Sequence, residues 1–162
     1  MGARAEALAS RIEQGAANLA AYVEKLSDAD WKRPVAQERD GRPVNVIVHH
    51  VASVYPIEVQ LAQAIGSGKA MSDVTWDVVR DMNAGHAKDN ANASKEDALN
   101  LLRKNSSEAA AAIRQMTDEQ LDTAAPFGLS FDAPVTAQFV IEDHAVRHSW
   151  HHLARIKQTL GE

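Results

Sequence analysis

Residues 43–65 read PVNVIVHHVASVYPIEVQLAQAI, and their apolar positions follow the spacing of an α-helix. Successive residues of a helix step by about 100° around its axis. Measured from His50, a set of aliphatic side chains falls within about 60° of it, namely Val46, Ile47, Val54, Ile57, Leu61 and Ile65. The stretch therefore predicts a long amphipathic helix that carries His50 near the middle of its buried face.

The same spacing recurs along the chain. We predict further long helices over residues 3–26, 95–116 and 135–160, and a shorter, less apolar helix over residues 75–92. The segments 32–42 and 124–134 contain proline and glycine and are predicted to be loops, and no strand periodicity is visible. Four long helices predict an all-α fold, a single four-helix bundle domain spanning residues 1–162.

Composition excludes several classes of protein. The chain has 162 residues, no cysteine and a net charge of −5. Disulfides, thiolate zinc sites and a cysteine nucleophile are therefore excluded, and an acidic chain without a basic block is a poor nucleic-acid binder. No segment has the length of apolar sequence that a membrane span needs, and residues 1–6 show no targeting pattern. We expect a cytoplasmic protein with neither a nucleic-acid nor a membrane partner.

Histidines stand out, because four of the seven lie between His144 and His152. On the last predicted helix, His148 and His152 are flanked by Ile141, Ala145 and Ile156, which places both in the bundle interior. His144 and His151 fall beside polar residues and are predicted to lie at the rim. By the same reasoning His50 points inward and His49 points outward.

An inward histidine on one helix and an inward His-x-x-x-His pair on another are typical of a metal site. Residues at i and i+4 can place two imidazole nitrogens on one ion. Three neutral imidazoles leave a coordination position open, and nitrogen ligands suit zinc, nickel, copper or iron. The alternative is that each histidine is an ordinary core residue with a hydrogen-bond partner. Because a metal explains all the inward placements together, we predict a site formed by His50, His148 and His152.

Three stretches of this sequence also resemble a known family. Residues 49–53 (HHVAS), residues 147–156 (RHSWHHLARI) and residues 82–87 (MNAGHA) resemble, in order and spacing, motifs of the DinB-like superfamily, over roughly residues 8–160. More closely, they look like the YfiT-type branch of metal-dependent hydrolases and thiol-dependent transferases. Ser53 stands where that branch often has an acidic residue, so the likeness is stronger to the superfamily than to the branch.

The resemblance implies an up-down-down-up four-helix bundle, with His50, His148 and His152 as ligands of a divalent metal, often nickel or zinc. It also implies a small-molecule substrate, such as a low-molecular-weight thiol, and a homodimer. The leading hypothesis is a metal-dependent enzyme of thiol S-transferase or hydrolase type. The sequence identifies no catalytic residue.

Several alternatives remain open. The protein could be a non-catalytic metal-containing stress or small-molecule-binding protein, or a bundle that only dimerises. A fourth protein ligand, such as His144 or His86, would indicate a closed structural site. Asn83 and His86 could line a pocket, although Asn83 could equally cap a helix. Glu58 is expected to be solvated rather than to line the site.

Overall fold

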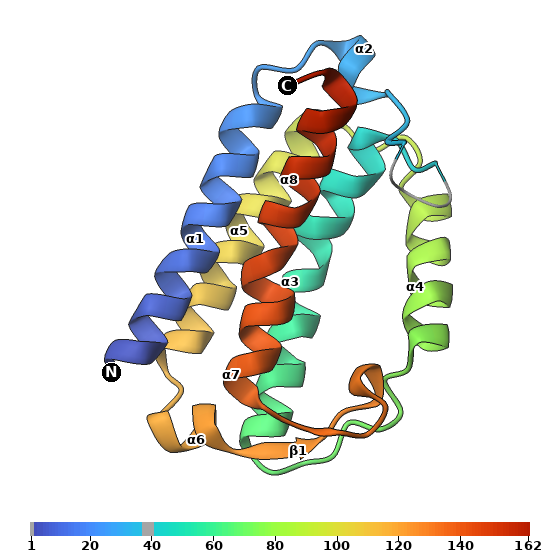
Figure 1. Cartoon of the computed structure of the whole chain (residues 1–162). Coiled ribbons are helices and arrows are strands. Elements are labelled where there is room, and N and C mark those ends of the chain that lie inside the picture. The colour runs from blue at the N-terminus through green and yellow to red at the C-terminus, as the bar shows by residue number, and fades with distance from the viewer. Residues whose placement is uncertain (1, 37–40) are drawn as a thin grey trace.

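The computed structural model describes residues 2–36 and 41–162. Its long helices are α1 (Ala3–Val23), α3 (Val44–Gly66), α5 (Lys95–Arg114) and a final helix that begins with α7 (Ala137–Val140) and ends with α8 (Arg147–Leu160). Figure 1 shows α1 rising, α3 and α5 descending, and the final helix rising again. The predicted all-α bundle and its up-down-down-up order are confirmed.

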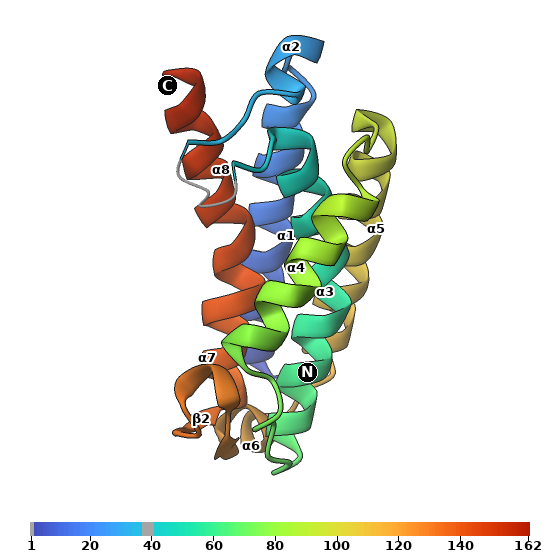
Figure 2. The ribbon, with the colours of Figure 1, turned by 90° about the vertical axis from the view of Figure 1, so that its right-hand side faces the viewer.

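Helix α4 (Trp76–Asp89) lies outside this bundle. It returns the chain from the foot of α3 to the start of α5, which is what allows α3 and α5 to run in the same direction. Figure 2 shows α4 in front of α3 and beside the final helix. None of its residues is buried, and α4 covers one face of the bundle with Val79 packed against the core.

Hydroxyl side chains cap the N-terminal ends of several helices, α4 and α5 among them. Thr75 accepts a hydrogen bond from the backbone N–H of Val78 at the start of α4, and Ser94 accepts one from Asp97 at the start of α5. Thr117 forms a reciprocal capping box with Gln120 at α6 (Asp118–Asp122). Such caps satisfy backbone donors that have no partner within the helix.

The core lies between the four long helices. Ile12, Leu19, Ile47, Leu102 and Ile156 are all fully buried in it. The short helix α2 (Asp28–Trp31) closes one end with the buried indole of Trp31. No helix in the described part of the chain has both the length and the apolar character needed to cross a membrane.

Two buried hydrogen bonds tie α3 to its neighbours. Pro56 has no N–H to donate to the carbonyl of Ala52, one turn earlier. Nδ2 of Asn105 on α5 donates to that carbonyl instead, at 2.8 Å. Tyr55 Oη and Ser149 Oγ lie 2.5 Å apart and link α3 to α8. These contacts fix the two helices that carry the predicted metal ligands.

Two expectations about the C-terminal third are corrected. The segment 124–134 is not simply a loop, because β1 (Ala124–Pro126) pairs antiparallel with β2 (Pro134–Thr136) around the short turn η1 (Gly128–Ser130). The last helix is not a regular α-helix either, because η2 (Ile141–Val146) is a π-helical turn. A π turn spaces its hydrogen bonds one residue further apart, so the 100° step does not hold between His144 and α8.

Candidate metal centre

His50, His148 and His152 come together as predicted. One ring nitrogen of each lies within 4.8 Å of those of the other two. The ring centroid of His148 is 5.0 Å from that of His50 and 4.9 Å from that of His152. His50 and His152 are buried and His148 is partly buried, so the inward placement is confirmed. Their role as ligands stays a prediction.

The electrostatics of the cluster favour uncharged imidazoles. Burial lowers the pKa of His50 to about 2, and proximity to His148 and His152 adds to this effect. His50 is therefore neutral at physiological pH and keeps a lone pair on one ring nitrogen. Metal ions bind histidine in this neutral form.

Glu58 corrects an expectation from the sequence. Its side chain is only 7% exposed, and Oε1 lies 2.6 Å from Nδ1 of His148. A carboxylate at this distance accepts the Nδ1–H proton and leaves Nε2 of His148 for a metal. Glu58 is thus part of the site, not solvated. The helical wheel places it about 80° from His50, but the sequence alone does not show that α8 packs against that side of α3.

His49 is also less exposed than predicted. It points away from the bundle core but meets α4, where its Nδ1 lies 2.8 Å from Nε2 of His86. The ring of His86 is 5.5 Å from that of His50. Burial lowers the pKa of both His49 and His86. The pair packs beside the cluster and is separate from the three-histidine group.

A pocket of about 340 Å³ opens beside the cluster. All three clustered histidines, Glu58 and Asn83 line it, as do His144 and His151. The prediction that His144 is a water-exposed rim residue is wrong in part, because its side chain is only 18% exposed and packs edge-on against Phe127. Asn83 is not a helix cap, since it lies within α4.

The three histidines leave the side of the metal centre that faces the pocket without a protein ligand in the described chain. Among residues 2–36 and 41–162, no fourth histidine or carboxylate joins the three-histidine group. Neither His86 nor His144 supplies the closing ligand that a structural site would need. The cluster therefore has the number of protein ligands typical of catalytic sites.

Comparisons with known proteins agree with this fold. The DinB superfamily model matches residues 6–156. The chain belongs to the DinB superfamily. No curated protein matches this DinB protein. Among solved structures it is similar to YfiT from Bacillus subtilis, described as a probable metal-dependent hydrolase with an unusual four-helix bundle topology. The TM-score is 0.77 at 20% sequence identity, over 98% of this chain and 87% of that one.

The residues present fit the divalent metal that the superfamily implies. Three imidazoles converge, one of them is hydrogen-bonded to a carboxylate, and the buried Oε2 of Glu58 has no hydrogen-bond partner among the described residues. A buried polar atom without a partner is costly unless something else satisfies it. A metal, its remaining ligand or a bound substrate would account for this arrangement.

Proposed function

We propose that this DinB protein binds one divalent transition metal, nickel or zinc, and is a metal-dependent enzyme of thiol S-transferase or hydrolase type acting on a small molecule. His50, His148 and His152 would hold the ion. The observation that carries the proposal is the convergence of these three imidazoles, without a fourth protein ligand in the described chain, on the wall of a pocket.

The metal would supply Lewis-acid chemistry, polarising a carbonyl or activating water or a thiol at neutral pH. The protein's residues prepare the site for this. Glu58 holds the His148 ring in one orientation and increases the electron density on its other nitrogen. Burial keeps His50 neutral, and the helix contacts of Tyr55 and Asn105 fix the relative positions of α3, α5 and α8.

Any thiol used in the reaction must come from a substrate, because the chain contains no cysteine. The pocket, which residues of α4 line in part, gives such a molecule access to the histidine cluster. A closed metal site would not provide this access, and this favours the enzyme over a purely structural use of the metal.

The test is a metal-dependence assay. Nickel- or zinc-loaded protein is offered cysteine, coenzyme A or glutathione with an electrophilic acceptor, and p-nitrophenyl acetate for hydrolysis. We expect turnover that is lost with chelator and in His148→Ala. Full metal occupancy without turnover on either panel would instead support a non-catalytic metal-containing stress or small-molecule-binding protein.

A further inference from the structure

Helix α4 forms one wall of the pocket beside the histidine cluster. Trp76, Val79 and Met82 line the pocket from α4, together with residues of α3 and of the final helix. None of the 14 residues of α4 is buried, whereas α5 buries side chains along its length, from Ala98 to Ile113. An element with few buried apolar contacts opens at a lower free energy than the core does.

The central part of α4 has few contacts with the bundle. Val79 packs against the core. Arg80 pairs with Asp77 and Asp81 within α4, and among the described residues no side chain in 77–85 hydrogen-bonds to another element. Detached from the bundle, a helix of 14 residues that contains Gly85 would be only marginally stable. Separation of α4 would therefore expose its backbone amides to water.

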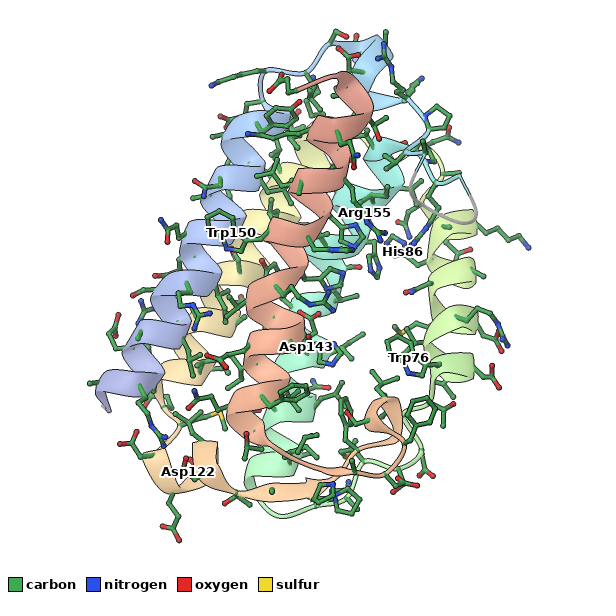
Figure 3. The ribbon with its side chains drawn as sticks, in the orientation of Figure 1. Trp76, His86, Asp122, Asp143, Trp150 and Arg155 are labelled. Carbon is green, nitrogen blue, oxygen red and sulfur yellow. The ribbon has the colours of Figure 1, made fainter. Side chains whose placement is uncertain are left out.

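Polar contacts near each end hold α4 against the bundle. At its start, Nε1–H of Trp76 donates to the backbone carbonyl of Leu129 at 3.0 Å. Near its end, Nε2 of His86 lies 2.8 Å from Nδ1 of His49 on α3, and one of these nitrogens donates to the other. Figure 3 shows Trp76 and His86 both extending from α4 toward the bundle. We call these two interactions the end contacts of α4.

The chain is also anchored on both sides of α4. Before the helix, the backbone N–H of Met71 donates to the carbonyl of Pro126 at 2.8 Å. After it, Nδ2 of Asn45 donates to the carbonyl of Ala91 at 2.9 Å. Because both anchors lie outside α4, the helix can separate from the bundle while the segments before and after it stay in place.

Helix α4 also bounds the space through which the cluster is reached. His50 and His152 are buried, and the ring of His86 on α4 lies 5.5 Å from that of His50. The pocket touches all three clustered histidines and five residues of α4, namely Trp76, Val78, Val79, Met82 and Asn83. An ion or small molecule at the open side of the cluster therefore lies between α4 and the bundle.

We propose that α4 is a gate over the histidine cluster. It separates from the bundle, breaking the end contacts, to let the metal ion and small molecules enter and leave, and it closes when these contacts form again. The inference rests on the proposed function, because the gate controls access to the proposed metal centre.

The rate of zinc removal tests the gate. Zinc-loaded protein is mixed with excess pyridylazoresorcinol in a stopped-flow instrument, and the absorbance of the dye reports zinc transfer. We expect Trp76→Phe and His49→Ala each to speed the transfer about fivefold, because each variant removes one hydrogen bond of the closed state. The equilibrium affinity for zinc should stay unchanged, since opening speeds entry and exit alike.

Two variants are matched controls for these substitutions. Trp150→Phe makes the same change outside the pocket, and Asp81→Asn alters an exposed side chain of α4 that takes no part in the end contacts. Both should transfer zinc at the rate of the wild type.

Amide hydrogen exchange tests the same opening without a metal. In metal-free protein, we expect the amides of α4 to exchange at least about tenfold faster than those of α5, because α4 opens without unfolding of the core. Trp76→Phe should raise the exchange rates of α4 further and leave those of α5 unchanged.

The outcomes separate the two proposals. Equal zinc transfer in the wild type, Trp76→Phe and His49→Ala would overturn the gate, as would α4 amides that are protected as strongly as those of α5. A loss of zinc affinity in proportion to the faster transfer would also contradict it, because that result indicates a weakened site. A wild type that retains neither zinc nor nickel would overturn the proposed function, and amide exchange would still decide whether α4 opens.

Discussion

Oε1 of Glu58 lies 2.6 Å from Nδ1 of His148, and the two side chains join α3 to α8 beside the histidine cluster. This carboxylate–imidazole pair fixes which nitrogen of His148 faces a metal. Glu58 is not one of the proposed ligands, so its effect on metal binding can be measured separately from theirs.

Replacing this carboxylate should weaken metal binding without abolishing it. We expect Glu58→Gln to lower the affinity for zinc about 10–100-fold, because the amide is a poorer acceptor and no longer supports His148 electrostatically. Competition with a chromophoric chelator measures this. Glu108→Gln, on the exposed face of α5, is the control. Equal affinities of the two variants would contradict the positioning role of Glu58.

Metal-free protein should lose stability as the pH falls. The pKa of His50 is about 2 in the folded chain, and about 6.5 is expected in the unfolded chain. Between these values the unfolded chain binds a proton that the folded chain does not, so the free energy of unfolding decreases below pH 6.5, by at most about 1.4 kcal/mol per pH unit.

Burial also lowers the pKa of His86 and of His144. Both histidines therefore add to the decrease in the free energy of unfolding as the pH falls. Urea unfolding with chelator present, at pH 7.5 and 5.5, should show the loss of stability, and His50→Gln should reduce it. A variant with the same pH dependence as the wild type would show that His50 is not the group responsible.

The hydrogen bond from Asn105 to the carbonyl of Ala52 should contribute to stability. Asn105→Ala leaves that buried carbonyl without a donor, since Pro56 cannot supply one, and should cost about 1–3 kcal/mol. Chemical denaturation measures the difference. Asn100→Ala, exposed on the same helix, should change stability by less than about 0.5 kcal/mol. Similar losses in both variants would show a general effect on α5.

Gly128 packs closely against the backbone of the segment that joins α3 to α4. A Cβ there would lie 2.5 Å from the carbonyl oxygens of Ser72 and Val74, so Gly128→Ala should destabilise by about 1–3 kcal/mol. A Cβ at Gly85, inside α4, would meet nothing within 4 Å. Gly85→Ala should therefore stabilise, by up to about 1 kcal/mol. Thermal unfolding distinguishes them, and a stable Gly128→Ala would contradict the close approach.

Most of the bundle and the three-histidine group could be predicted from the sequence, because both depend on the periodicity of individual helices. His50 and the pair His148 and His152 lie on apolar stripes, which identify the face that turns inward. The π turn before α8 and the short hairpin were not predicted, since neither has an apolar period of its own.

Glu58 and the contact between His49 and His86 depend on how helices pack against one another. The wheel of α3 gives the direction of Glu58 but not the presence of His148 on that side. Likewise His49 lies on a polar side, and only the path of α4 covers it. The homodimer implied by the family resemblance stays a prediction.

The central claim is that His50, His148 and His152 hold a metal. The most direct measurement is the metal content, by plasma mass spectrometry, of wild type, His148→Ala and His49→Ala after reconstitution with nickel and zinc. The wild type and His49→Ala should retain about one ion per chain, and His148→Ala should retain none. A metal-free wild type, or equal loss in both variants, would contradict the claim.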